Sequence, residues 1–149
     1  MTYDAQLMKK IGIDIFSGAG GLSLGGAMAG IKVRYAIEVN PHAAKSFELN
    51  HKGAKVICGD IRDVKATDFL NKDEEVFIIM GGPPCQGFSM SNTMSRNMDN
   101  PNNLLFKEFV RLVSEIKPRW FVLENVWGMT KMNNGETIEM IKHCFEEIE

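Results

Sequence analysis

Short apolar runs alternate along this chain with longer segments in which apolar residues recur every three or four positions. The short runs are rich in Val, Ile and Phe and are bounded by Gly, Pro or charged residues, as is typical of buried strands. All four residues at 120–123 are apolar, which is the pattern of a parallel strand covered on both faces. Five strands are predicted, at Ile11–Phe16, Lys32–Val39, Lys55–Ile61, Val76–Met80 and Trp120–Glu124.

Helices are predicted between these strands. Asn40 is a good N-cap residue followed by a proline, and it predicts a helix over Pro41–Asn50. The clearest helical period covers Leu104–Lys117 and stops at Pro118. Alternating strands and helices predict an α/β fold with a mostly parallel sheet. The remaining helical segments are Leu22–Ala29, Thr137–Glu149 and a short helix or loop at Ala66–Lys72.

The first predicted strand runs directly into a glycine-rich turn. Gly18, Gly20 and Gly21 lie in this turn, and the sequence strand–turn–helix is the opening of a Rossmann-type nucleotide-binding unit. Glycines let the backbone pass close to a ligand, and the helix N-terminus favours negative charge. The spacing departs from GxGxxG, so a plain tight turn is the alternative at this point.

Acidic residues end the second and third predicted strands. Glu38 follows the glycine turn by about 20 residues, where a carboxylate can accept hydrogen bonds from both ribose hydroxyls of a nucleotide. Asp60 is placed to accept from the exocyclic amine of an adenine, and Ile61 to pack on its ring. The alternative for Glu38 is a solvated carboxylate at a strand end.

Residues 76–89, VFIIMGGPPCQGFS, place a cysteine after a stiff turn. The apolar run stops at two glycines, and Pro83 and Pro84 then restrict the backbone just before Cys85. In open α/β sheets this end of a strand is where ligands bind. A thiol presented there suits nucleophilic catalysis, and the alternative is a buried cysteine beside a turn.

Composition narrows the class of protein. The chain has 149 residues, 44% hydrophobic and 24% charged, which fits one globular domain. Its three cysteines lack CxxC spacing, which argues against a disulfide framework or a metal site and favours a reducing cytoplasm. Cys58 is interpreted as a small core residue. A net charge of −2 gives no indication of the positive charge that nucleic-acid binding requires. No apolar run has the length of a membrane span.

Three stretches together resemble the DNA (cytosine-5) methyltransferases. Asp14–Gly25, DIFSGAGGLSLG, is similar to the motif of that family that binds S-adenosylmethionine. Gly82–Ser89, GPPCQGFS, is similar to its Pro-Cys catalytic motif, and residues 124–126 to its Glu-Asn-Val motif. Order and spacing agree, and the resemblance covers nearly the whole chain from residue 11. It implies a Rossmann-like S-adenosylmethionine-dependent methyltransferase fold with helices on both faces of the sheet.

The resemblance also implies roles for individual residues. Cys85 would attack C6 of a cytosine flipped out of double-stranded DNA, and Glu124, with a pKa raised in a dry pocket, would bind the N3/N4 edge. Pro84, Gln86 and Asn125 complete the catalytic motifs. The loop Met90–Asn103 is interpreted as a lid with Ser89, Ser91 and Arg96 as DNA contacts. The residues implied around the cofactor are Phe16, Ser17, Gly18, Ala19, Gly20, Gly21, Leu22, Glu38, Val39, Asp60, Ile61, Pro83 and Leu105. Val39 stands where relatives often place a larger side chain.

The family continues beyond residue 149 with two more strands, a target-recognition region and a last motif that returns to the cofactor. We therefore expect residues 1–10 to be a lead-in and 11–149 to be the cofactor-binding and catalytic subdomain alone. Five strands in the order 3-2-1-4-5 would leave Trp120–Leu123 as an open edge. The expected partners are double-stranded DNA and a complementary C-terminal fragment or subunit.

Two other functions are weighed against this one. The chain could serve as a non-catalytic module of a split methyltransferase that binds the cofactor or a partner chain. The glycine turn and Glu38 also fit a nicotinamide-dependent oxidoreductase, but that function leaves GPPCQGFS and Glu-Asn-Val without a role.

Overall fold

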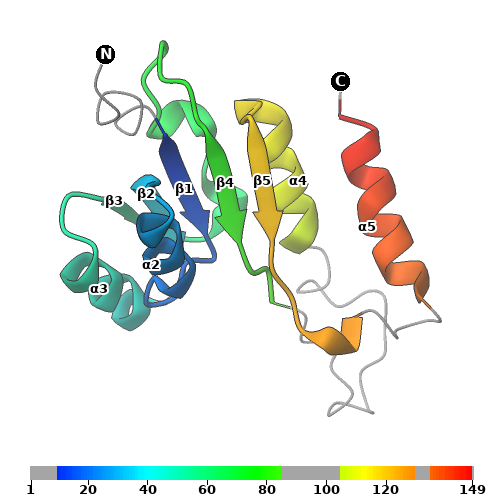
Figure 1. The fold of residues 1–149 in the computed structure, drawn as a ribbon, viewed down its shortest axis with the longest axis horizontal. Coiled ribbons are helices and arrows are strands. Elements are labelled where there is room, and N and C mark those ends of the chain that lie inside the picture. The colour runs from blue at the N-terminus through cyan, green and yellow to red at the C-terminus, as the bar shows by residue number, and fades with distance from the viewer. Residues whose placement is uncertain (1–9, 85–104, 130–134, 149) are drawn as a thin grey trace.

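The computed structural model describes residues 10–84, 105–129 and 135–148. Within these ranges, five parallel strands form one sheet in the order β3-β2-β1-β4-β5 (Figure 1). This is the order predicted from the sequence. The strands are β1 (Ile11–Ile15), β2 (Lys32–Glu38), β3 (Lys55–Cys58), β4 (Ile78–Gly81) and β5 (Trp120–Leu123).

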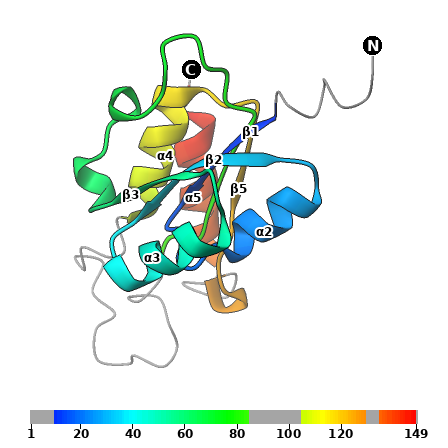
Figure 2. The ribbon, with the colours of Figure 1, turned by 90° about the vertical axis from the view of Figure 1, so that its left-hand side faces the viewer.

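Helices cover both faces of the sheet, as predicted. Figure 2 shows α2 and α4 on opposite sides of the strands, and α5 packs on the same side as α4 through a shared apolar cluster. The α-helices are α2 (Gly21–Met28), α3 (Pro41–Asn50), α4 (Leu105–Ile116) and α5 (Glu136–Glu146), and two short 3-10 helices are η1 (Ile61–Asp63) and η2 (Ala66–Asp68). In the described part of the chain, no helix is long and apolar enough to cross a membrane.

Alternating residues of β1 determine which helix packs on which face. Ile13 and Ile15 are fully buried in a cluster that includes Phe109 of α4. Asp14, between them, points to the other face and is hydrogen-bonded to Ser23 of α2. This alternation is the two-residue period of a strand, and it fixes the sheet between the two helices.

Local signals in the sequence explain where two helices begin and end. The Asn40 side chain caps α3 by accepting hydrogen bonds from the amides of His42 at 2.9 Å and Ala43 at 3.1 Å. Helix α4 ends at Ile116, and Lys117 takes the left-handed conformation, with φ +50°. Pro118 follows and cannot continue the helix.

Strand β3 is shorter than predicted. It ends at Cys58, because the Asp60 side chain accepts the Arg62 amide at 3.0 Å and starts η1, so that Ile61 lies in this helix and not in a strand. The interpretation of Cys58 as a core residue is wrong, since its side chain is exposed. The reason is its position at the end of an edge strand.

Strand β5 forms the other edge of the sheet, as expected. Trp120, Phe121 and Val122 are 59%, 42% and 45% exposed, so the described residues do not cover both faces of this apolar strand. The Phe145 ring of α5 stacks on Phe121 with 4.3 Å between ring centroids. Helix α5 therefore covers one face of β5 only in part.

Candidate functional site

The carboxyl ends of β1, β2, β4 and β5 lie along one edge of the sheet (Figure 1). At these four ends lie the glycine turn after β1, Glu38 as the last residue of β2, the turn at Pro83 after β4 and the Glu-Asn-Val motif after β5. In open parallel sheets this edge is the usual ligand site.

The glycine turn after β1 has a fixed and unusual backbone. Phe16, Gly18 and Gly20 take positive φ angles of 59°, 54° and 96°, and a left-handed non-glycine residue costs about 1–2 kcal/mol. The Ser17 amide donates to the Ile37 carbonyl at 3.1 Å, and the Gly20 amide donates to the Ser17 carbonyl at 2.9 Å. Backbone strain held by such bonds is typical of functional turns.

Glu38, at the end of β2, is bound to this turn. Its two carboxylate oxygens accept the Gly18 amide at 2.8 Å and the Asn40 amide at 2.7 Å. Each oxygen keeps further acceptor capacity. The structure thus brings Glu38 against the glycine turn and gives it the role of fixing that turn, while its binding of a ribose stays a prediction.

Asp14, beneath the turn, caps α2 from a neighbouring strand. The N-cap residue Gly20 has no side chain, and one Asp14 carboxylate oxygen accepts both the Ser23 amide at 3.2 Å and the Ser23 hydroxyl at 2.6 Å. The other oxygen is buried and has no hydrogen-bond partner. Burial raises the pKa of Asp14 from 3.8 to about 6, hydrogen bonds from Ser23 oppose this rise, and the charge of Glu38 adds to it.

Asp60, predicted as the acceptor for an adenine amine, is already paired. The Arg62 guanidinium donates to both of its carboxylate oxygens, from Nε at 2.9 Å and from Nη2. Hydrogen bonds from the Arg62 side chain and then from its amide lower the pKa of Asp60 to about 2. Asp60 therefore stays ionised, and an adenine amine would share it with Arg62.

Three of the apolar residues predicted around the cofactor belong to one cluster. Ile61 is buried in it, and Phe16 and Leu105 pack against it half-buried. Val39 lies outside this cluster and is 65% exposed. Ser17 is buried with an unpartnered hydroxyl, Leu22 is half-buried, and Ala19 is exposed.

The turn after β4 is fixed by the residues that follow β5. The Asn125 side-chain amide donates to the Pro83 carbonyl at 3.0 Å, while its oxygen accepts the Val126 amide at 2.8 Å. The Glu124 amide donates to the Gly81 carbonyl at 2.9 Å and continues the pairing of the two strands. The Pro-Pro turn and the Glu-Asn-Val motif are thus one hydrogen-bonded unit.

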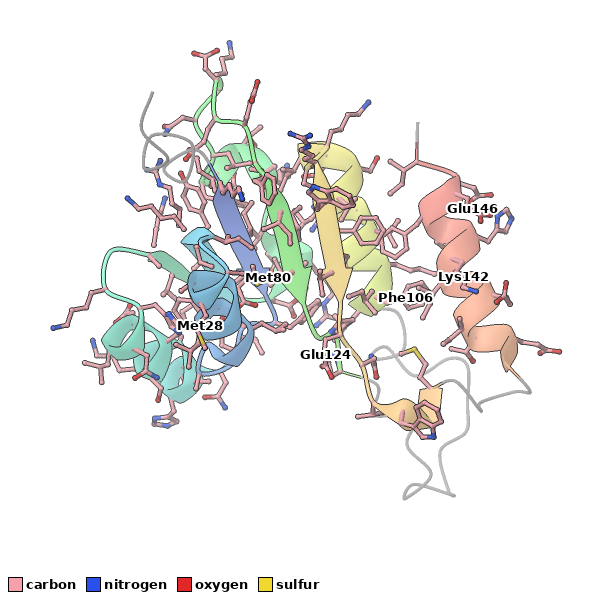
Figure 3. All side chains as sticks on the ribbon, in the orientation of Figure 1. Met28, Met80, Phe106, Glu124, Lys142 and Glu146 are labelled. Atoms are coloured by element: carbon pink, nitrogen blue, oxygen red, sulfur yellow. The ribbon has the colours of Figure 1, made fainter. Side chains whose placement is uncertain are left out.

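Glu124 lies just past the end of β5, beside the Pro-Pro turn (Figure 3). A Cβ on Gly82 would lie 2.9 Å from a carboxylate oxygen of Glu124, so the glycine permits this close approach. Glu124 is exposed. The dry pocket expected around it is therefore not formed by the residues that the structure describes.

The family model for C-5 cytosine-specific DNA methylases matches residues 11–149 of this chain. The chain belongs to this family. It is 40% identical over 139 residues to the Type II methyltransferase M1.HphI of Haemophilus parahaemolyticus, covering 91% of this chain and 37% of that protein. It is 38% identical over 138 residues to M.AquIA of a Picosynechococcus strain, covering 90% of this chain and 55% of that protein.

Solved structures agree with this assignment. A crystal structure described as a prophage-encoded DNA modification methyltransferase of E. coli matches 92% of this chain and 38% of that one, with a TM-score of 0.77 and 35% identity. The S. pombe Dnmt2 methyltransferase, at 22% identity and a TM-score of 0.62 over 90% of this chain and 39% of that one, shows the shared fold. The chain spans 28% to 55% of the length of the curated relatives reported with it.

The family assignment confirms the resemblance read from the sequence, and the described part of this methylase chain holds most of the predicted site. Of the predicted catalytic residues, Pro84, Glu124 and Asn125 are described and lie at adjacent strand ends. The predicted residues Cys85, Gln86, Ser89, Ser91 and Arg96 lie outside the described residues, and their roles stay predictions.

Several residues that hold the glycine turn of this methylase chain could not be predicted from the sequence. Asp14 alternates with the buried Ile13 and Ile15, which places its side chain on the opposite face of the sheet, where Ser23 binds it. Asn50 and His51 bond the turn from 31 positions away, and no local pattern marks that contact.

Proposed function

We propose that this chain is the cofactor-binding and catalytic part of a DNA (cytosine-5) methyltransferase. It would transfer a methyl group from S-adenosylmethionine to C5 of a flipped cytosine in double-stranded DNA, through a covalent bond between Cys85 and C6. One observation carries the proposal. The glycine turn and the Pro-Pro turn leave adjacent parallel strands, β1 and β4, at the same edge of the sheet.

The glycine turn fits a cofactor that the backbone must approach closely. A Cβ built at Gly18 or Gly21 meets no atom within 4 Å, so space is open beside the turn. Glu38, on the neighbouring strand end, offers carboxylate oxygens to a ribose. Asp60, which follows β3, lies at the same edge.

The residues that would hold the cofactor divide into three groups. Phe16, Ser17, Gly18, Ala19, Gly20, Gly21 and Leu22 form the turn; Glu38, Val39, Asp60 and Ile61 follow the next two strands; Pro83 and Leu105 lie on the side of β4 and α4. Bound S-adenosylmethionine supplies an electrophilic methyl group. Glu38 would bind the ribose hydroxyls, and Asp60 the adenine amine.

The cysteine is required because C5 of cytosine is a weak nucleophile. The Cys85 thiolate adds to C6, a C–S bond forms, and the ring electrons shift so that C5 becomes an enamine carbon that can take a methyl group. A base then removes the proton from C5, the C6–S bond breaks, and Cys85 leaves as a thiolate. The target atoms are stacked in duplex DNA, so the base must first be flipped out.

Glu124 and Asn125 would act on the cytosine and on the turn respectively. Glu124 would bind the N3/N4 edge of the cytosine while the thiolate adds to C6. Asn125 holds the Pro83 carbonyl, two residues before Cys85, so it sets the backbone from which the nucleophile projects. Further contacts to the flipped nucleotide and its strand are proposed for Gln86, Ser89, Ser91 and Arg96.

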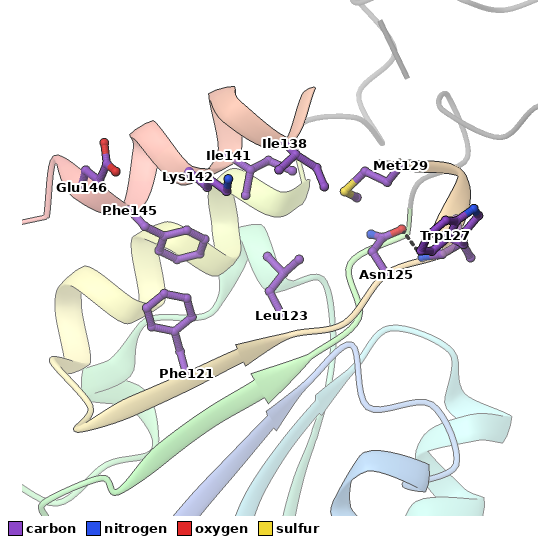
Figure 4. A pocket seen from close by; sticks show the side chains of 11 residues that line it. Phe121, Leu123, Asn125, Trp127, Met129, Ile138, Ile141, Lys142, Phe145 and Glu146 are labelled. Atoms are coloured by element: carbon purple, nitrogen blue, oxygen red, sulfur yellow. Dashed lines mark hydrogen bonds between the residues drawn. The ribbon is translucent and has the colours of Figure 1, made fainter. Parts of the chain in front are cut away.

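The edge strand β5 supports the need for a partner segment. A groove of about 730 Å³ lies between β5 and α5, and Figure 4 shows Phe121 and Phe145 facing each other inside it. Val126 lines this groove and is exposed, Trp120 of β5 is also exposed, and an open apolar edge strand favours pairing. We infer that a complementary C-terminal fragment or subunit covers this edge. The chain would then be one part of a split or longer enzyme, and a non-catalytic assembly module is the alternative.

Membership of the C-5 cytosine-specific DNA methylase family excludes a nicotinamide-dependent oxidoreductase as the function of this chain. The names of the relatives, Type II methyltransferases, support a role in restriction-modification. The cytoplasmic location expected from the scattered cysteines stays a prediction.

Methyl transfer tests the proposal directly. The chain is mixed with duplex DNA and methyl-labelled S-adenosylmethionine, with and without a C-terminal fragment taken from a relative such as M1.HphI. We expect label on cytosine C5 when the fragment is present and none with Cys85→Ala. Absence of transfer under both conditions would leave the assembly module as the function of this polypeptide.

A further inference from the structure

The glycine turn is held from behind by the end of α3. The Asn50 side-chain amide donates to the Ala19 carbonyl at 3.2 Å, and Nε2 of His51 lies 2.9 Å from the Gly20 carbonyl oxygen. A carbonyl only accepts, so Nε2 of His51 carries the proton in this bond. Two consecutive carbonyls of the turn are therefore bound by two consecutive residues of the helix end.

The His51 ring is itself fixed before it reaches the turn. Its amide donates to the Phe47 carbonyl at 2.8 Å, and its ring packs on the Phe47 ring with 4.4 Å between centroids. Phe47 is fully buried. A side chain that is already ordered loses little entropy when it forms its hydrogen bond.

The turn and the ring fit each other closely. A Cβ at Gly20 would overlap the His51 ring and lie 2.9 Å from the Phe47 ring, so only glycine leaves room for the ring at this position. The Gly20 φ of 96° also favours glycine. The contact between the glycine turn and α3 therefore requires glycine at position 20 and a side chain with an N–H donor at position 51.

The bound carbonyls determine where the amides of the turn point. In a trans peptide the C=O of one residue and the N–H of the next are antiparallel. The His51 bond to the Gly20 carbonyl therefore fixes the direction of the Gly21 amide, the first of α2. The same carbonyl accepts the Leu24 amide at 2.9 Å, which is the first turn of that helix.

We propose that Asn50 and His51 are positioning residues for the cofactor site. This proposal rests on the proposed function. Asn50 and His51 raise the affinity for S-adenosylmethionine by holding the glycine turn in its binding conformation, and they do not touch the cofactor. A bond that only stabilised the fold would lower the free energy of unfolding when lost but leave cofactor affinity in the folded protein unchanged.

Calorimetric titration with S-adenosylhomocysteine separates these two roles. The full chain is compared with His51→Ala, Asn50→Ala and the double variant, at a temperature where urea unfolding shows each to be folded. One net hydrogen bond of about 1 kcal/mol corresponds to about a fivefold change in Kd. We expect about fivefold weaker binding for each single variant and about 25-fold for the double variant.

Two further variants make the test specific. His51→Gln keeps an N–H donor at the same number of bonds from Cα, and we expect its Kd to lie within about twofold of the original. His42→Ala changes an exposed histidine of the same helix and should leave Kd unchanged. Weakening by His42→Ala equal to that by His51→Ala would contradict the inference.

The failure of this inference is distinct from failure of the proposed function. Binding by the original chain with an unchanged Kd in Asn50→Ala and His51→Ala overturns the positioning role alone. Lack of binding by the original chain overturns the proposed cofactor site, and the positioning role with it. If His51→Ala does not fold, the Kd of Asn50→Ala decides the question in the same way.

Discussion

Asp14 offers a direct test of how the buried turn is built. Its carboxyl group is fully buried beneath the glycine turn, with one oxygen bound to Ser23 and the other without a partner. Burial raises its pKa from 3.8 to about 6 in the folded chain. Asp14→Asn keeps the shape and an oxygen acceptor but carries no charge at any pH, so comparing the two chains isolates this titration.

The sign and size of the effect follow from linkage. Between pH 4 and 6 the folded state holds a proton on Asp14 and the unfolded state does not, so raising the pH destabilises the folded state. A pKa shift of about two units corresponds to about 3 kcal/mol. Relative to Asp14→Asn, the original chain should lose about 2.4 kcal/mol of unfolding free energy between pH 4 and pH 7, because the unfolded carboxyl group is already partly ionised at pH 4.

Urea unfolding at pH 4, 5, 6 and 7 measures this difference. Asp60→Asn is the control. Arg62 lowers the pKa of Asp60 to about 2, so the stabilisation that ionised Asp60 gives the folded state is lost only as the pH falls from about 4 toward 2. The difference in unfolding free energy between the original chain and Asp60→Asn should therefore be constant over the measured range. A constant difference for Asp14→Asn, or one that grows in favour of the original chain with pH, would refute the burial argument.

Three other substitutions test the turns. Gly20→Ala should lower the unfolding free energy by about 1–3 kcal/mol, because the φ of Gly20 is positive and the His51 ring occupies the space that a Cβ would need. Gly25→Ala is the control, since a Cβ there meets no atom within 4 Å, and it should leave the unfolding free energy in the same urea titration unchanged. Glu124→Gln should slow methyl transfer by about 10²–10⁴-fold with S-adenosylhomocysteine affinity unchanged, and equal losses in both would contradict its role. Asn125→Asp removes the donor to the proline turn and should cost about 1–3 kcal/mol in thermal or urea unfolding; unaltered stability would show that the bond is dispensable.

The fold was largely predictable because its signals are local. The helical period of α4 and the capping of α3 by Asn40 each lie within one segment of sequence. Parallel strands bring their carboxyl ends to one edge, which placed Glu38 and Glu124 correctly along that edge. Strand β3 was predicted too long, because the run of apolar residues does not show that Asp60 turns back to bind the Arg62 amide.

The side-chain partners of the site were not predictable in the same way. The bond from His51 to Gly20 joins residues 31 positions apart, and it depends on how α3 packs against the turn after β1. Asp60 was correctly placed just after a strand. The Arg62 guanidinium, two residues later, donates to its carboxylate, and this reduces the acceptor capacity that Asp60 has left for a ligand. Residue type and spacing thus locate a site, while packing decides the role of each residue.

Covalent trapping shows whether Cys85 is the nucleophile that attacks cytosine C6. The chain, its C-terminal complement and S-adenosylmethionine are incubated with duplex DNA containing 5-fluorocytosine, which cannot lose a C5 proton after methyl transfer. We expect a stable protein–DNA adduct that peptide mapping places on Cys85, with Cys58 and Cys144 unmodified, and that is lost in Cys85→Ala. An adduct that persists in Cys85→Ala, or no adduct with the original chain, would contradict this role of Cys85.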